Sequence, residues 1–371
     1  MSQQYKKDCG DYLIHLLKCA LNGEVPDEKP DNVSWKEVLL LAKYHNTANT
    51  ACYAVERLEN KPDDVIFSEW KEIKNKALVR DITQRSELKK LSDVFEKSEI
   101  KMMAVKGCRM KQLYPRTDMR FMSDLDIIVE SNSIPNVCNI LQELGYKSEK
   151  HNLSHHIEFN KPPVMHVEIH NALISEQWKS FTKYYSDPFK CGHPQKEKRF
   201  VYEMTDEEFY IYFLVHLYKH YSNGGTGIRS VMDCFMINKN LSSELDWTYI
   251  NKKLEQLELI KLKDDFDKLA DFWFASGNGS KVLESMGDYI ISSGTYGTIH
   301  NYVQNGIKSQ GRFRYLIGRI FPPYSLMKSL YPVLEHLPFL LPFFWIWKDI
   351  KALFSSKSTS KRQIKMMFKN K

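Results

Sequence analysis

Apolar residues recur at helical spacing through most of the first 97 residues. Residues 38–58 have this spacing, and Ser34-Trp35-Lys36-Glu37 before them is a capping box, in which Ser34 and Glu37 satisfy free N–H groups at a helix start. A second run, with alternating charges, covers residues 65–98. Neither run contains glycine or proline, so we expect two long helices in an N-terminal helical region, residues 1–97.

The pattern changes to short runs after residue 97. Four runs of apolar or β-branched residues predict strands: residues 102–105, 127–129, 157–159 and 164–169. The last two flank Pro162-Pro163 and predict a hairpin. Residues 131–145 have one apolar helical face and end at Gly145, a residue suited to closing a helix. Strands and helices alternate, which indicates a small α/β unit over residues 98–200.

Helical spacing returns after residue 200. Thr205-Asp206-Glu207-Glu208 is a second capping box, and its helix is expected to stop at Asn223-Gly224-Gly225. Another helix is expected over residues 228–238. We therefore predict an α+β fold with a small mixed sheet, followed by a C-terminal helical domain, residues 201–310, and an aromatic and basic tail, residues 311–371.

Composition and charge narrow the class of protein. The 371 residues are 43% hydrophobic and 27% charged, which excludes disordered, collagen-like and disulfide-scaffold proteins. The net charge is +7, and residues 348–371 hold eight Lys or Arg against one acid, Asp349. The rest of the chain therefore sums to zero, so its body is not a basic nucleic-acid binder.

The cysteines and the N-terminal sequence indicate the cellular compartment of the protein. The seven cysteines form no Cys-x-x-Cys pair, and scattered thiols are typical of a reducing cytoplasm. The N-terminus lacks the apolar run of a signal peptide, and no stretch reaches the roughly 18 apolar residues of a membrane span. We expect a cytoplasmic protein. Its basic tail, with Trp345, Trp347, Phe354 and Phe368, could lie on anionic lipid, bind a partner, contact RNA or be disordered, so residues 337–371 are a candidate peripheral membrane or partner contact.

Two aspartates at the start of a predicted strand are candidate metal ligands. Asp124 and Asp126 are two residues apart, so a strand places both carboxylates on one face. Carboxylate oxygens are the ligands that Mg²⁺ prefers, and a third acid on a neighbouring strand, Glu168, would complete a site for two metal ions. Such a site suits phosphoryl or nucleotidyl transfer, in which metal ions neutralise the phosphate oxygens.

A phosphate-binding turn is expected beside the acids. Gly107 follows the first predicted strand, and a residue without Cβ lets phosphates approach the backbone. Lys106, Arg109 and Arg120 supply cations nearby.

These residues resemble the nucleotidyltransferase superfamily, which has the polymerase-β-like fold, and most closely its bacterial "uncharacterised nucleotidyltransferase" branch. The resemblance spans residues 35–300. The shared motifs are Val105-Lys106-Gly107, Tyr114-Pro115, Arg120-x-x-Ser123-Asp124-x-Asp126, Glu168-Ile169-His170, His216-x-x-x-His220 and Arg229-x-x-x-Asp233.

The resemblance implies an enzyme with a nucleotidyltransferase-type sheet that moves a nucleoside monophosphate from an NTP to a hydroxyl or amine and releases pyrophosphate. Asp124, Asp126 and Glu168 would bind Mg²⁺ or Mn²⁺, and Glu168 or Asp126 would also accept the proton of the nucleophile. The expected nucleotide contacts are Lys106, Gly107, Cys108, Arg120, Ser123 and Arg229. ATP is the first choice among the NTPs, and the acceptor is a small molecule, tRNA or protein.

One position departs from the superfamily pattern. The superfamily usually has serine after the glycine, whereas this chain has Cys108, a poor hydrogen-bond donor. This departure leaves Lys106 to supply a phosphate contact.

Other interpretations remain open. His166, Glu168 and His170 share one strand face and could hold Zn²⁺ or Fe²⁺ in a mononuclear metal hydrolase. The chain could also be a catalytically silent scaffold that binds a nucleotide or partner, or a toxin-like transferase. His216 and His220 are one helical turn apart, which suits either a metal site or two neutral core histidines.

Two further motifs have both a structural and a functional interpretation. Arg229 and Asp233 form either an ion pair between helices or, through Arg229, a nucleotide contact. Residues 223–227 form either a flexible helix end or a phosphate loop.

Overall fold

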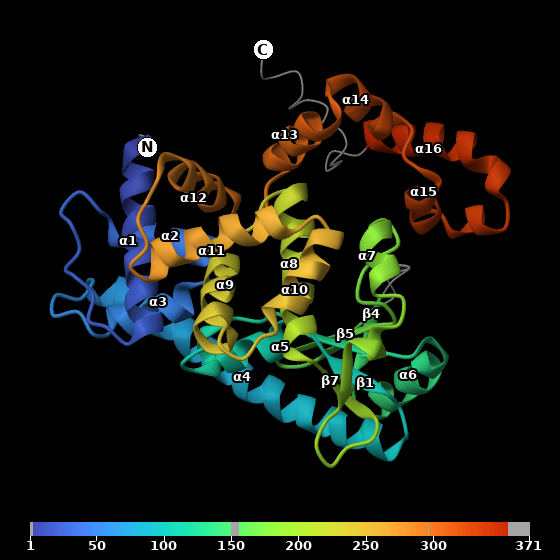
Figure 1. The fold of residues 1–371 in the computed structure, drawn as a ribbon, viewed down its shortest axis with the longest axis horizontal. Helices are drawn as coiled ribbons and strands as arrows, with labels where there is room; N and C mark the ends of the chain where they lie inside the picture. Colours follow the sequence, from blue (N-terminus) through green and yellow to red (C-terminus); the bar gives the residue numbers. More distant parts are fainter. Residues whose placement is uncertain (1–2, 150–155, 296, 355–371) are drawn as a thin grey trace.

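The structure is a computed structural model that describes residues 3–149, 156–295 and 297–354. The N-terminal region contains α1 (Gln3–Asn22), α2 (Trp35–Tyr44), α3 (Ala48–Val55) and α4 (Asp64–Lys97). The long helix predicted for residues 65–98 is confirmed as α4, which passes along one side of the sheet (Figure 1). Asp63 caps this helix by accepting the N–H of Ile66 at 3.0 Å.

The single helix predicted for residues 38–58 is wrong, because the chain breaks between α2 and α3. Asn46 adopts a left-handed φ of 52°. The N–H of Asn46 bonds to the Lys43 carbonyl and that of Thr47 to the Ala42 carbonyl, which is the Schellman pattern that ends helices. Ser34 begins α2 with its backbone alone, since its side chain makes no cap bond.

In the part of the chain that the structure describes, seven strands form one mixed sheet in the order β3-β4-β5-β2-β1-β7-β6. The strands are β1 (Met102–Ala104), β2 (Leu125–Val129), β3 (Lys147–Glu149), β4 (His156–Lys161), β5 (Met165–His170), β6 (Gly192–Pro194) and β7 (Val201–Met204). β2 pairs antiparallel with β1 and parallel with β5. The predicted strands and hairpin are confirmed, whereas β3, β6 and β7 were not predicted. The α+β class is therefore correct.

Short helices connect strands of the sheet along the chain. They are α5 (Gly107–Met110), α6 (Ile134–Glu143) and α7 (Lys179–Tyr184). α6 confirms the helix predicted before Gly145, which has a φ of 85°. This positive φ is the left-handed conformation that closes a helix.

The C-terminal helical domain packs onto the sheet. It contains α8 (Asp206–Asn223), α9 (Ile228–Leu241), α10 (Trp247–Gln256), α11 (Ile260–Phe274) and α12 (Lys281–Ser293). Half of the second capping box is confirmed: the Thr205 hydroxyl accepts the Glu208 N–H at 3.2 Å, but the Thr205 N–H bonds to the Cys191 carbonyl instead of to Glu208. α8 ends before Gly224, as predicted.

Alternation along the strands places the two cores on opposite faces of the sheet. Met103 and Ile128 join the large core that contains α1–α3 and α8–α12. Met102 and Ile127 join a second core with α4 and α6. Asp126 has the same parity as Ile128, so its carboxylate is on the face that α8 covers.

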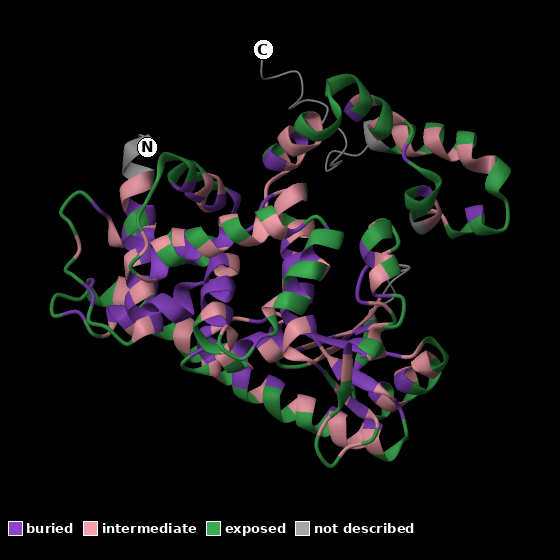
Figure 2. Cartoon of the chain, viewed as in Figure 1, coloured by how far each residue is buried: buried purple, intermediate pink, exposed green. Residues whose placement is uncertain are grey.

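The last described segment has little core of its own. It comprises α13 (Ile299–Gln310), α14 (Arg312–Ile320), α15 (Tyr324–Leu330) and α16 (Leu341–Phe354). Its own core cluster is centred on Val303 and Tyr315, and Figure 2 shows much of its surface exposed. Among the described residues, no helix is long and apolar enough to cross a membrane. Phe368 and the basic residues of the predicted tail beyond residue 354 lie outside the described residues.

Candidate functional site

The turn beside the acids is a tight β-turn from Val105 to Cys108. The Cys108 N–H bonds to the Val105 carbonyl at 3.3 Å, and Lys106 has φ 55° and ψ −115°. These are the angles of the second residue of a type II′ turn, where glycine is the usual residue. Lys106 therefore holds a strained backbone, a feature that concentrates at functional sites. A Cβ on Gly107 would lie 2.7 Å from Sδ of Met122, so a larger residue at this position would require the Met122 side chain to move.

Two N-terminal helices hold the loop that leads into Asp124. Asn49 of α3 donates to the Met119 carbonyl at 2.9 Å, and Gln84 of α4 donates to the Met122 carbonyl at 3.0 Å. All four of these residues are buried. Because the donors lie on packed helices, they fix the backbone path immediately before the first aspartate.

The three predicted acids lie on adjacent strands. Asp126 of β2 is directly opposite Glu168 of the parallel strand β5, and Asp124 precedes β2 by one residue. Burial raises the pKa of Asp124, and the charges of Asp126 and Glu168 raise it further. Asp124 accepts a hydrogen bond from the Ser123 hydroxyl at 3.0 Å.

A lysine and a histidine lie between these acids. Lys106 Nζ is 2.5 Å from Oδ1 of Asp126, and His170 Nε2 is 2.9 Å from the same oxygen and 3.2 Å from Oε2 of Glu168. Burial raises the pKa of Asp126, but Lys106 and His170 outweigh it and hold that pKa below its usual value. The His170 hydrogen bond likewise lowers the pKa of Glu168. For His170 itself, burial lowers the pKa, but the two carboxylates outweigh burial and raise it.

A cavity of about 340 Å³ opens over the aspartates, between the sheet and helices α8 and α9. It is lined by seven of the nine residues that the sequence assigns to metal or nucleotide: Lys106, Gly107, Arg120, Ser123, Asp124, Asp126 and Arg229. Cys108 does not line it, because its Sγ packs into the second core, 4.0 Å from Sδ of Met122. Glu168 does not line it either, and contacts His170 beside Asp126.

Three polar residues of α8 form one wall of this cavity: His216, Lys219 and His220. Burial lowers the pKa of His220 to about 4, and burial also holds the pKa of His216 well below its usual value. Both rings are therefore neutral near pH 7, and their centroids are 4.6 Å apart. Burial, reinforced by Lys106, lowers the pKa of Lys219 to about 8.

A second cavity of about 900 Å³ adjoins the first. Lys106, Tyr212 and Lys219 line both cavities. The second is also lined by His156 and His170, and by residues of the 172–177 and 323–335 segments. Lys106, which is paired with Asp126, therefore lies where the two cavities meet.

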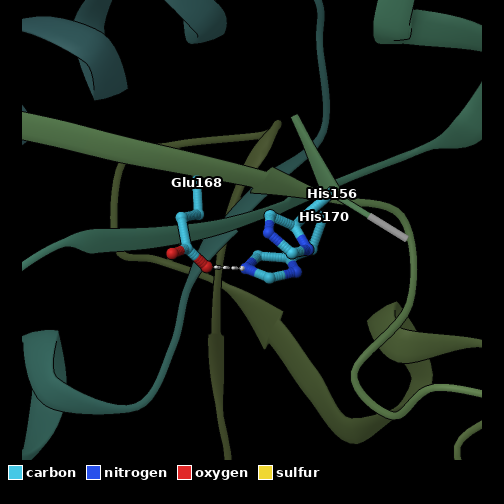
Figure 3. Close-up of side chains that lie close together, drawn as sticks. All are labelled: His156, Glu168 and His170. Atoms are coloured by element: carbon cyan, nitrogen blue, oxygen red, sulfur yellow. Dashed lines mark ion pairs between the residues drawn. The ribbon is translucent and has the colours of Figure 1, made fainter. Parts of the chain in front are cut away.

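Two histidines and Glu168 lie close together at this junction (Figure 3). Among the described residues, the ligand atoms of His156, Glu168 and His170 lie within 4.8 Å of one another. The sequence predicted that His166 would share a metal site with Glu168 and His170. His156 takes that place instead, because it lies opposite His170 in the β4–β5 register. Nδ1 of His166 is 2.5 Å from Oδ1 of Asn160 instead.

A comparison with known protein families bears on this arrangement. The model of a family described as "Uncharacterised nucleotidyltransferase" matches residues 31–273, more than half of the chain. The chain belongs to this family. No match was found among curated proteins or among solved structures. The matched range includes the whole sheet and the helices α8 and α9 of the nucleotidyltransferase, and hence the aspartates and most of the first cavity.

Some motif residues form other pairs than those that the sequence indicated. Asp233 pairs with Arg120 rather than with Arg229: Nη2 and Nε of Arg120 lie 2.8 and 3.1 Å from the two Asp233 oxygens. The Tyr114 hydroxyl donates to the same carboxylate at 2.7 Å. Arg229 donates to the Phe121 carbonyl at 3.3 Å and lines the cavity. The buried pair therefore ties the loop before Asp124 to α9.

Asp124, Asp126 and Glu168 offer oxygen ligands for a divalent cation, but among the described residues they are not a group whose ligand atoms all lie within 4.8 Å of one another. All their donor atoms are carboxylate oxygens, which suit Mg²⁺ or Mn²⁺. Lys106 and His170 offset part of the negative charge at Asp126 and Glu168, while like charges still raise the pKa of Asp124. Added positive charge beside Asp124 would therefore be favourable.

Sequence reasoning missed several residues of this site, among them Lys219 and His156. Lys219 lies between the two histidines of the helical motif, so its place on the same stretch of α8 was an available signal. His156 precedes the predicted hairpin strand by one residue, and only strand pairing brings it opposite His170.

Proposed function

We propose that this chain transfers a nucleoside monophosphate from an NTP to a hydroxyl or amine, with ATP as the first candidate donor. The observation that carries the proposal is the cavity in which Asp124 and Asp126 face the Lys106-Gly107 turn and the cations of α8 and α9. Membership of the family supports nucleotidyl transfer in general. The metal dependence, the donor and the acceptor are our proposals.

The first cavity would hold the triphosphate. Lys106, Lys219 and Arg229 line it and supply positive charge, and Thr226 and Ser230 add hydroxyl donors at the start of α9. A helix N-terminus adds partial positive charge, which favours phosphate. The Asp233 pair orients Arg120 at the edge of this cavity, where it can donate to phosphate oxygens.

Asp124, Asp126 and Glu168 would hold Mg²⁺ or Mn²⁺. A bound divalent cation would neutralise phosphate oxygens and stabilise the leaving pyrophosphate. Lys106 keeps Asp126 ionised, because its ammonium group lowers the pKa of that carboxyl, so Asp126 is ready to bind a cation at neutral pH.

The second cavity would admit the acceptor. It meets the first at Lys106, Tyr212 and Lys219, next to the acids. The acceptor oxygen or nitrogen forms a bond to the α-phosphorus, the α–β bridging bond breaks, and pyrophosphate leaves. The acceptor proton passes to Asp126 or Glu168. Holding both reactants beside one set of acids supplies the proximity that catalysis requires.

A mononuclear metal hydrolase is the second candidate, because His156, Glu168 and His170 converge. Its weakness is the environment of His170. Nε2 of His170 faces two carboxylate oxygens at 2.9 and 3.2 Å, so this nitrogen carries a proton that it donates and cannot also coordinate a metal. Tight binding of Zn²⁺ or Fe²⁺ with hydrolysis would favour this candidate over transfer.

Asp124→Asn tests the proposal. The four NTPs, each labelled at the α-phosphate, are incubated with the full chain, Mg²⁺ and cell extract, and labelled products and pyrophosphate are measured. The native chain is expected to transfer label. Asp124→Asn is expected to lower the rate by about 10²–10³-fold, because metal-ion charge stabilisation contributes several kcal/mol.

Asp93→Asn is the matched control, since Asp93 lies on α4, is paired with Lys198 and does not line either cavity. Transfer that survives in Asp124→Asn would contradict the proposal. Nucleotide binding without any pyrophosphate release would support the silent scaffold. Growth arrest on expression that Asp124→Ala abolishes would support the toxin-like transferase.

A further inference from the structure

The exposed apolar side chains of this protein are concentrated in its last described segment. Of the 21 large apolar side chains that are exposed in the described part of the chain, 13 lie between Phe313 and Ile350. All the exposed phenylalanines and the exposed tryptophan among them belong to this group. A concentration of this kind marks a binding surface, because scattered exposed apolar residues are ordinary but clustered ones are not.

α16 carries a continuous apolar stripe. Phe343, Ile346, Trp347 and Ile350 are 61, 62, 49 and 42% exposed, and their spacing of three and four residues places them on one helix face. The opposite face is packed within the segment. Trp345 donates through Nε1 to the Pro322 carbonyl at 2.9 Å, and its ring is 5.3 Å from that of Phe321. The packing fixes α16 with its apolar stripe outward.

α14 repeats this arrangement. Phe313 is 74% exposed, and Ile317, four residues later, is also exposed. Tyr315, on the other side of the helix, is buried against α13. Arg312 and Arg314 flank Phe313 and are exposed. Each of the two helices therefore presents aromatic and aliphatic side chains, with cations beside them in α14.

The C-terminal part of the chain has a strong net positive charge. Residues 299–371 contain thirteen Lys or Arg against two acids, a net charge of +11, so residues 1–298 sum to −4. Positive charge beside exposed aromatic rings is complementary to an anionic lipid surface, where basic residues approach headgroups and Trp and Phe enter the interface. A second copy of this segment would instead bring two strongly positive surfaces together, which costs free energy.

We propose that the segment formed by α14, α15 and α16 binds the surface of an anionic lipid membrane, with the α16 stripe and the α14 stripe inserted among the headgroups. This surface is separate from the acids, so the proposal is independent of the transfer reaction. The segment is attached to the catalytic body through α13, which packs against α8.

Vesicle co-sedimentation of the full chain tests the proposal. The probes are phosphatidylcholine vesicles with and without a large fraction of phosphatidylglycerol. The chain is expected to sediment with the anionic vesicles and to be released by high salt. The combined variant Phe343→Gln, Ile346→Gln, Trp347→Gln and Ile350→Gln is expected to bind at least tenfold more weakly, because it removes the inserted apolar area.

The matched control replaces four exposed apolar residues outside the segment by glutamine: Val65, Val79, Ile82 and Val282. It is expected to bind vesicles as the native chain does. Circular dichroism and light scattering of each protein report folding and oligomeric state. Absence of binding to anionic vesicles overturns the proposal, as does equal binding by the α16 variant. A dimer or an RNA complex that depends on the α16 stripe, without vesicle binding, also overturns it and identifies the other occupant.

Discussion

Lys106 and Lys219 show how single residues create the character of this site. Both line the two cavities, but their environments differ. Lys106 is paired with Asp126. Lys219 is buried near the positive charge of Lys106, and both effects lower its pKa to about 8. Lys219 is therefore a cation of the site whose charge changes near pH 8.

We predict that the affinity for Mg²⁺-NTP weakens as the pH rises through about 8, because the Lys219 amine then loses its charge. Lys219→Arg should keep the affinity and lose this pH dependence, since arginine stays charged. Lys219→Gln should lose the dependence and bind about tenfold or more weakly, because a hydrogen bond to a charged group contributes about 1.5–3 kcal/mol. Calorimetric titration of nucleotide across this pH range measures both effects, and an unchanged pH profile in Lys219→Gln would refute the assignment.

The break between α2 and α3 shows how one element sets the position of another. Asn46 ends α2, and the resulting turn lets α3 place Asn49 and Thr50 against the Met119 carbonyl. A continuous helix through residue 46 would carry these donors away from the loop before Asp124. The local turn therefore has a role in building the site.

Asn46→Val is expected to destabilise the protein by about 1–2 kcal/mol, because a left-handed φ is costly for a residue with Cβ, especially a branched one. Asn46→Gly should be neutral or slightly stabilising. Asn60→Val, in an exposed loop outside the left-handed region, serves as the control and should change stability by less than about 0.5 kcal/mol. Urea denaturation gives these values, and equal effects at both positions would exclude the conformational explanation.

At the scale of the whole molecule, His45 joins segments that lie far apart in the sequence. Its Nδ1 accepts the Ile228 N–H at 3.2 Å and its Nε2 donates to the Ile291 carbonyl at 3.0 Å, so the N-terminal helices are tied to α9 and α12. The same ring is fully buried. Burial lowers the pKa of His45 to about 4, which keeps the imidazole neutral in the folded protein.

This environment predicts a stability loss in acid. The unfolded chain protonates His45 near pH 6.5 and the folded chain near pH 4, so the unfolded state binds more protons between these values and stability falls as the pH is lowered. The full shift corresponds to on the order of 3 kcal/mol. His45→Gln should be less stable at pH 7 and should have a shallower dependence of unfolding free energy on pH. A slope identical to that of the native chain would show that His45 does not titrate in this way.

The C-terminal segment links location and chemistry across the molecule. Residues of α15 and of the 332–335 turn line the second cavity, while α14 and α16 carry the exposed apolar stripes. Attachment to a membrane through these stripes would therefore bring the second cavity close to the lipid surface.

Much of the fold follows from local signals. Helical periodicity and caps located α4, α8 and α9, and apolar runs located β1, β2 and the β4–β5 hairpin. These features depend on contacts a few residues apart, so the sequence carries them directly. The strands β3, β6 and β7 are short and lack a strong pattern, and their pairing partners rather than their own residues define them.

The sequence by itself determined the α+β alternation, the pairing of two aspartates on one strand face and the glycine turn beside them, because backbone periodicity and steric demand are local. Only the tertiary structure decided which distant side chains meet. In the folded chain Asp233 pairs with Arg120, and Lys219 lines both cavities. Cys108 is part of the second core, and His156 lies opposite His170. Those contacts depend on how packed layers bury charge and exclude water, and no short stretch of sequence contains that information.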